Sequence, residues 1–196
     1  MQELMVDFII SLDGYASADG WPGWWGLESP EYLAWLEDQP DTFTTLMGAT
    51  TYRLMSGFAA GAAGTEQEAD AMSSLTASPK VVFSSTLDEP LDWANTRLVT
   101  GDAVEEVPRL KAECGQPLHT LGSVRLCRSL LTAGLVDRFR LVVFPVITGA
   151  TGSERIFDNY PDVALDLVES RTFEGGLQLL DYVPRVLDGP PESGTA

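Results

Sequence analysis

The sequence predicts an α/β domain whose central, mostly parallel sheet carries helices on both faces and ends in an antiparallel hairpin. Strand-like apolar segments alternate with helix-like segments over most of the 196 residues, a pattern typical of parallel strands joined by helical crossovers. After Gly134 the pattern changes to three strand-like runs with no helix between them, which indicates antiparallel pairing. A chain of this length is one domain, and we expect it to span residues 1–183.

The N-terminal half is expected to begin with a strand over 5–10 and a turn over 11–14, followed by a loop over 18–26. A helix should begin after Ser29, because Ser is a good N-cap, Pro30 suits the first helical position and an acidic residue follows. It should end before Pro40. Further along we expect a strand over 42–47, a helix from 48 through 55, a loop over 57–64 and a helix over 65–75.

The second half continues the alternation and then loses it. Strands are expected over 80–83, 96–99 and 118–121, with helices over 102–113 and 123–133 between and after them. Gly134 is the expected residue just past the last helix. The closing strands should cover 138–146, 164–173 and 177–183, with a hairpin turn over 174–176. Residues 184–196 are rich in Pro, Gly and Ser, and we expect a disordered tail there.

Composition excludes several classes of function. The 12 basic and 29 acidic residues give a net charge of −17, which would repel a nucleic acid. No apolar run approaches the roughly 20 residues that a membrane span needs. The first residues lack a basic segment, and Asp7 interrupts the apolar stretch that follows. We therefore expect a soluble, cytoplasmic protein without nucleic-acid or membrane partners.

Few residues could bind a soft metal ion. Cys114 and Cys127 are the only cysteines and form no CxxC pair, and His119 is the only histidine. The H-x-E…C-x-x-C pattern of zinc deaminases is absent. We expect two free thiols and no metal site.

Three predicted strand ends carry small or hydroxylated residues, at 48–51, 84–86 and 122–125. In an open α/β sheet, ligands bind beyond the carboxyl ends of the strands. Glycine lets the backbone approach a phosphate, and free amides at a helix N-terminus bind its oxygens. Neither GxGxxG nor the P-loop motif occurs. The alternative is that Gly48 and Gly122 only make the tight turns that strand-to-helix junctions need.

Six short motifs together resemble the dihydrofolate reductase superfamily. The last two point to its riboflavin-biosynthesis branch, the reductase domain at the C-terminal end of RibD. In family order, the motifs occupy 9–15, 46–52, 82–85, 119–126, 134–137 and 144–147. The resemblance covers residues 4 to about 183 and implies a dihydrofolate reductase-like three-layer fold. The branch also implies a homodimer formed through the C-terminal strands.

The resemblance implies NADPH as cofactor, held by these strand ends. The residues that it places against the cofactor are Ile9, Ala16, Gly48, Thr50, Thr51, Ser84, Ser85, Gly122, Ser123, Val124 and Arg125. The backbone of the first two would face the nicotinamide carboxamide, and the threonines would meet phosphates. The two serines would lie near the adenosine ribose and its 2′-phosphate, and the last four residues would wrap the pyrophosphate.

Ala49 departs from the family, because dihydrofolate reductases often carry a phosphate-binding arginine at this position. The departure weakens the expected preference for NADPH over NADH. Arg53, Lys80 or Arg97 could compensate, or each could be an ordinary surface charge.

The substrate side departs further from dihydrofolate reductases, which carry a pterin-binding carboxylate on the first helix. The matching position here is Tyr32, and a phenol with an ordinary pKa near 10 is a poor substitute. The aromatic and apolar residues that could stack on a flat substrate are Trp21, Trp24, Trp25, Tyr32 and Leu36. The catalytic residue stays unknown, with Asp13, Glu28 and Tyr32 as candidates. Asp13 could equally form the turn, and two of the tryptophans could belong to the core or to a dimer interface.

These observations favour a reductase that transfers a hydride from NADPH to an imine or carbonyl of a small heterocyclic substrate. The family precedent is reduction of 5-amino-6-(5-phosphoribosylamino)uracil, here without a deaminase domain. Two alternatives are open: a non-catalytic nucleotide- or pterin-binding protein of the same fold, and a true dihydrofolate reductase, which Tyr32 disfavours.

Overall fold

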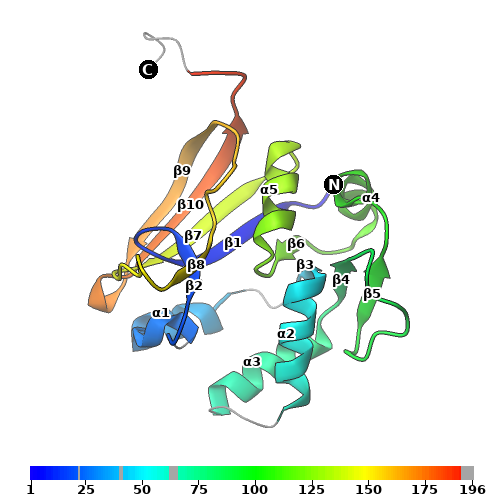
Figure 1. The fold of residues 1–196 in the computed structure, drawn as a ribbon, viewed down its shortest axis with the longest axis horizontal. Helices are drawn as coiled ribbons and strands as arrows, with labels where there is room; N and C mark the ends of the chain where they lie inside the picture. Colours follow the sequence, from blue (N-terminus) through cyan, green and yellow to red (C-terminus); the bar gives the residue numbers. More distant parts are fainter. Residues whose placement is uncertain (22, 40–41, 62–65, 191–196) are drawn as a thin grey trace.

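The structure, a computed structural model, is organised around one long twisted sheet (Figure 1). It describes residues 1–21, 23–39, 42–61 and 66–190, without the side chains of residues 23, 24 and 66–68. The sheet has the strand order β5-β4-β3-β6-β1-β7-β10-β9. Its strands are β1 (Leu4–Ser11), β3 (Thr44–Gly48), β4 (Lys80–Phe83), β5 (Thr96–Val99), β6 (Leu118–Thr120), β7 (Arg138–Phe144), β9 (Val163–Thr172) and β10 (Gln178–Val186).

The neighbouring strands from β5 through β7 are all parallel, and β10 runs antiparallel to both β7 and β9. The predicted mixed sheet with a C-terminal antiparallel hairpin is thus confirmed. A separate antiparallel pair joins β2 (Tyr15–Ala18) to β8 (Gly152–Arg155). The sequence did not predict this pair, because both strands are four residues long and neither alternates apolar with polar residues.

Helices cover both faces of the sheet, as predicted (Figure 1). The helices are α1 (Pro30–Glu37), α2 (Ala49–Ala60), α3 (Glu66–Ala77), α4 (Ala103–Glu113) and α5 (Val124–Thr132), with short 3-10 turns at η1 (Gly23–Gly26) and η2 (Glu174–Gly176). On one face, α4 and α5 pack on Leu4, Val6, Phe8 and Ile10 of β1 within one apolar cluster. The other face has two clusters, one under α1 and one under α2 and α3.

Local signals in the sequence account for several helix ends. Ser29 caps α1 by accepting a hydrogen bond from the backbone amide of Tyr32, and Asp102 caps α4 in the same way at Val104. Gly134 follows α5 with φ of +67°, a backbone conformation that glycine adopts without steric cost.

Two predicted boundaries were wrong. Helix α2 continues through Gly57 to Ala60, because Met55 and Ala59 pack against the core beneath it. Strand β10 continues past residue 183, so the predicted tail does not begin at 184. Pro184 pairs with Leu165 of β9 but has no partner on β7, and an unpaired side is where a strand tolerates proline. The rest of the predicted tail, residues 191–196, lies outside the described residues.

Over the described residues, none of the helices is both long and apolar enough to cross a membrane.

Candidate functional site

The N-termini of α2 and α5 meet at the carboxyl ends of β3 and β6. The Gly48 amide donates a hydrogen bond to Ser123 Oγ over 2.8 Å, and Ser123 Oγ donates to Thr51 Oγ1 over 2.8 Å. The first contact joins residues 75 positions apart in the chain. The structure therefore brings Gly48, Thr51, Gly122 and Ser123 together in one junction, as the resemblance implied.

The backbone of this junction is shaped for a close approach. Gly122 has φ of +53° and Ser123 has φ of +63°, and a left-handed serine costs free energy that functional sites often carry. A Cβ added at Gly122 would lie 3.4 Å from Thr51 Oγ1. Neither helix has a side-chain cap at its N-terminus, so its first amides are free to bind an anion such as a phosphate.

A second group of polar residues lies where β4 ends. Ser84 Oγ accepts hydrogen bonds from the amides of Thr86 and Leu87. The guanidinium of Arg53, an exposed residue of α2, donates to Thr86 Oγ1 over 3.4 Å. Arg53 thus lies beside the strand end that the resemblance assigned to the adenosine ribose.

Lys80 does not take part in this site. Its ammonium group donates to the backbone carbonyls of Leu75, Thr76 and Ser78 at the end of α3, and it lies against the Trp93 ring. Burial lowers the pKa of Lys80 to about 8. Lys80 therefore caps a helix and cannot compensate for Ala49, whereas Arg97 stays exposed on β5.

Asp13 anchors a turn. Its carboxylate accepts hydrogen bonds from Ser11 Oγ over 2.6 Å and from the amides of Thr148 and Gly149. Desolvation opposes ionisation, but these hydrogen bonds outweigh it and lower the pKa of Asp13 to about 2. At neutral pH the group is an ionised acceptor and has no proton to donate, so its role as a candidate acid is corrected to that of a turn-former.

The predicted aromatic pocket is largely core. Tyr32 has no exposed surface, and its ring packs against Trp35, Phe144 and Phe173 with centroids 5.5–5.9 Å apart. Burial, and after it the negative charge of Asp7, raise the pKa of the Tyr32 phenol. Tyr32 is therefore neither a pocket wall nor an available acid, which corrects both expectations for it.

Most of the other predicted pocket residues also pack in the core around Tyr32. Trp25 is 5% exposed and belongs to the same cluster, and Leu36 packs against that cluster. Trp21 is 40% exposed and meets Trp25 edge to face. The side chain of Trp24 lies outside the described residues.

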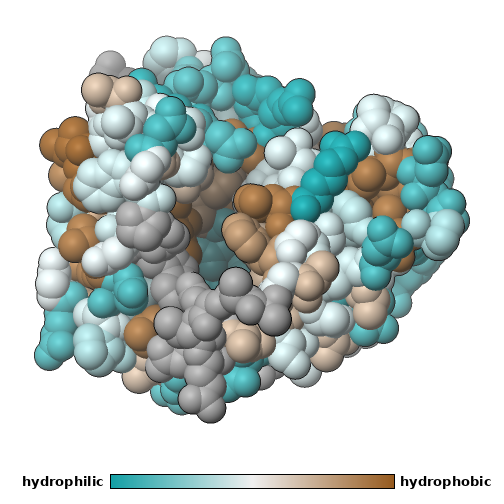
Figure 2. All heavy atoms as spheres, turned by 60° about the horizontal axis from the view of Figure 1, so that its bottom comes forward, coloured by the Kyte–Doolittle hydropathy of each residue, from teal (hydrophilic) through white to brown (hydrophobic). Residues whose placement is uncertain are grey.

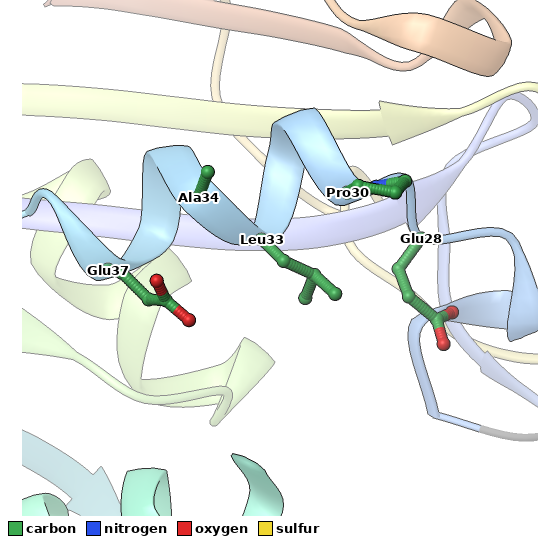
Figure 3. A pocket seen from close by; sticks show the side chains of 5 residues that line it. All are labelled: Glu28, Pro30, Leu33, Ala34 and Glu37. Carbon is green, nitrogen blue, oxygen red and sulfur yellow. The ribbon is translucent and has the colours of Figure 1, made fainter.

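The opposite side of α1 faces a hollow of about 380 Å³. Figure 3 shows Glu28, Leu33 and Glu37 pointing to the same side of the α1 segment. Pro30 and Ala34 complete the lining. Glu28 thus remains a candidate catalytic residue, whereas Leu33 and Glu37 were not predicted to be part of the site. Figure 2 shows a hollow near the centre of this side of the molecule, with hydrophobic and hydrophilic residues at its walls.

The sequence analysis did not predict a group of three ionisable residues on the face of the sheet that carries α1. His119 Nε2 lies 3.3 Å from Asp7 Oδ2, and Arg140 Nε donates to that oxygen over 3.1 Å. We call Asp7, His119 and Arg140 the floor cluster. Burial opposes ionisation of Asp7, but His119 and Arg140 outweigh it and lower the pKa of this carboxyl. The signal in the sequence was a charged residue inside the apolar first strand.

With this geometry established, comparison with known proteins decides the family. The family model described as "RibD C-terminal domain" matches residues 2–179. The chain belongs to the RibD C-terminal domain family. The Bacillus subtilis protein YyaP is 25% identical over 181 residues, which cover 92% of this chain and 94% of YyaP.

Two solved structures share the fold of this RibD C-terminal domain. A putative riboflavin biosynthesis protein from Shewanella sp. PV-4 superposes with a TM-score of 0.71 at 21% identity, covering 94% of this chain and 99% of that one. A pyrimidine reductase-like protein from Corynebacterium diphtheriae superposes with a TM-score of 0.64 at 15% identity, covering 94% and 92%. At these identities the likeness extends to the fold alone.

Proposed function

We propose that this chain is an NADPH-dependent reductase that transfers a hydride to a C=N or C=O bond of a small heterocyclic substrate. The observation that carries the proposal is the junction of Gly48, Thr51, Gly122 and Ser123, where two uncapped helix N-termini meet. Several dipoles aimed at one point can bind a pyrophosphate even on a chain with a net charge of −17. The nicotinamide would supply the hydride.

The remaining parts of the cofactor have matching positions. Ser84, Ser85 and Arg53 would receive the adenosine ribose and its 2′-phosphate, because a guanidinium binds phosphate oxygens well. Thr50, Val124 and Arg125, in the first turns of α2 and α5, would add phosphate contacts. The nicotinamide would lie along the backbone of Ile9 and Ala16, beside the floor cluster.

Membership of the RibD C-terminal domain family supports a pyrimidine intermediate of riboflavin biosynthesis as the first substrate to try. The burial of Tyr32 keeps dihydrofolate a disfavoured substrate, since α1 presents no carboxylate at that position. A cytoplasmic location, where NADPH is available, is part of the same proposal.

The first test is a titration of the purified protein with NADPH and with NADH, followed by the fluorescence of its five tryptophans. We expect saturable binding of NADPH. Gly122→Ala should weaken it at least tenfold, because the added Cβ lies against Thr51 where the pyrophosphate would bind. The matched control is Gly134→Ala, a left-handed glycine after α5 with no neighbour within 4 Å. Equal NADPH affinity in the two variants, or no binding by the wild type at millimolar concentration, would contradict the proposal.

We also propose a homodimer formed through the C-terminal strands. Strand β9 is the edge of the sheet and exposes Leu165, Leu167 and Val168, and an exposed apolar edge strand favours pairing with another chain. Light scattering should give about twice the 21.2 kDa mass of one chain. A particle with the mass of one chain would refute the dimer.

A further inference from the structure

The floor cluster occupies a gap between two apolar clusters. On the face of the sheet that carries α1 and α2, one cluster lies under α1 and includes Val142 of β7, and the other lies under α2 and α3 and includes Met47 of β3. Strands β1 and β6 run between β7 and β3. Asp7 and His119 stand on these two middle strands, and neither residue belongs to either apolar cluster.

The two residues stay partly accessible. The side chain of His119 keeps 23% of its exposure and that of Asp7 keeps 21%. Within the described residues, the only hydrogen bond of the His119 ring is the one from Nε2 to Asp7, so Nδ1 can contact a ligand.

Two polar atoms beside the ring support a ligand site. Asp7 Oδ1 and Thr45 Oγ1 are buried, and among the residues that the structure describes none forms a hydrogen bond with either atom. Thr45 pairs with His119 in register on the neighbouring strand, so its side chain lies on the same face. Unpaired buried polar atoms are costly, and two of them flanking one histidine indicate a missing polar partner.

The cluster also points toward the proposed cofactor. His119 is level with Met5 on β1, yet its ring bonds to Asp7, two residues nearer the carboxyl end of the strand. Ile9, where the nicotinamide is proposed to lie, is two residues further on and on the same face as Asp7. A strand advances about 3.3 Å per residue, so a ring stacked on the nicotinamide would reach the floor cluster.

We propose that His119 is the proton donor of the reduction, and that Asp7 and Arg140 are positioning residues. This inference rests on the proposed function. The dihydronicotinamide transfers a hydride to the carbon of a C=N or C=O bond, and the nitrogen or oxygen takes the proton of His119 Nδ1. The substrate gains two electrons, the cofactor becomes oxidised nicotinamide, and the neutral imidazole recovers its proton from solvent.

The surroundings fit this assignment. In the described part of the chain, the charged groups that face the ring are Asp7 from β1 and, behind it, Arg140 from β7. Tyr32 of α1 stays neutral because its pKa is raised. Gln39, just after α1, is an uncharged amide that accepts a hydrogen bond from Arg140 and donates one to the Trp35 carbonyl. Phe43 meets the ring edge-on at 4.8 Å. The carboxylate fixes the ring by its bond to Nε2, which leaves the Nδ1 proton for the substrate.

The test compares His119→Gln with the wild type in NADPH oxidation, using 5-amino-6-(5-phosphoribosylamino)uracil and dihydrofolate as the substrate panel. General acid catalysis contributes about 10²–10⁴-fold, so we expect kcat to fall at least 100-fold while the Kd of NADPH stays unchanged. The wild-type rate should fall as pH rises through the titration of the imidazole, and the variant should lose this dependence. The matched control is Asp137→Asn, which removes a carboxylate paired with Lys111 of α4 outside the floor cluster and should keep the wild-type pH profile.

Asp7→Asn tests the positioning role of Asp7 without unfolding the protein, because the amide has nearly the same shape as the carboxylate but no charge. Its kcat should fall while the Kd of NADPH stays unchanged, since the ring has lost the carboxylate that orients it. His119 is the only histidine, so NMR can follow its ring alone and should show a changed environment of Nε2. If the wild type turns over a substrate and His119→Gln matches its kcat and pH profile, the proton-donor assignment is refuted and the proposed function stands. If the wild type binds no NADPH, the proposed function fails first.

Discussion

The two halves of the candidate site differ in how their residues are held. At the cofactor junction, the backbone carries the chemistry: Gly122 and Ser123 adopt positive φ, and hydrogen bonds join α2 to α5. At the substrate half, side chains carry it, and the floor cluster draws one charged residue from each of β1, β6 and β7. Under the proposed function, we expect the backbone half to tolerate varied side chains and the side-chain half to select the substrate.

This difference explains why Tyr32 and Leu36 of α1 were wrongly expected to line a pocket, whereas the glycines of the junction could be singled out from the sequence. A glycine before a helix is a local signal that the sequence displays directly. Helix α1 has eight residues, and its apolar side chains Tyr32, Leu33, Trp35 and Leu36 point in several directions. In so short a helix the pattern does not identify which side faces the sheet. Tyr32 and Leu36 turned inward, and Leu33 turned toward the hollow.

The largest expected effect is a loss of stability when Tyr32 is truncated, because its ring belongs to the core. Tyr32→Ala should lower the free energy of unfolding by about 3–5 kcal/mol, as deletion of a buried aromatic ring does. Tyr32→Phe keeps the ring among Phe144 and Phe173 and should change it by less than about 1 kcal/mol. Urea denaturation measures both. NADPH oxidation should survive in Tyr32→Phe, and its loss in a stably folded variant would return Tyr32 to the list of catalytic candidates.

A smaller effect would show whether side chains also matter at the cofactor half. Arg53→Gln should weaken NADPH binding about tenfold, or about 1.4 kcal/mol, because the guanidinium lies beside Thr86 at the end of β4. Binding of NADH should not change, since NADH lacks the 2′-phosphate. Arg97→Gln, an exposed arginine of β5, is the control. If Arg53→Gln left NADPH affinity unchanged, the backbone alone would hold the cofactor.

Much of the fold could be read from the sequence, because helix caps, apolar strands and glycine turns act over a few residues. Ser29, Asp102 and Gly134 each marked a helix end correctly. The floor cluster could not be read in this way, because its members lie 112 and 133 positions apart and meet only through the strand order. Asp7 was visible as a charge in an apolar strand, but its partners depend on which strands flank β1.

The smallest expected effect concerns Asp13, which links the turn after β1 to the loop after β7. Its pKa is lowered to about 2 in the folded protein, so its contribution to stability is complete above the ordinary value near 4 and disappears as pH falls toward 2. Asp13→Asn has no such titration. The difference in thermal stability between wild type and variant should therefore be constant from pH 7 to about 5 and shrink below pH 4.

The control for Asp13 is Asp19→Asn, which replaces another carboxylate of the same N-terminal segment. NADPH oxidation by Asp13→Asn should persist at neutral pH, because the amide oxygen can still accept one of the two backbone hydrogen bonds from Thr148 and Gly149. A folded Asp13→Asn protein without activity would show that this carboxylate takes part in the reaction, and it would move the acid of the site from the floor cluster to the turn.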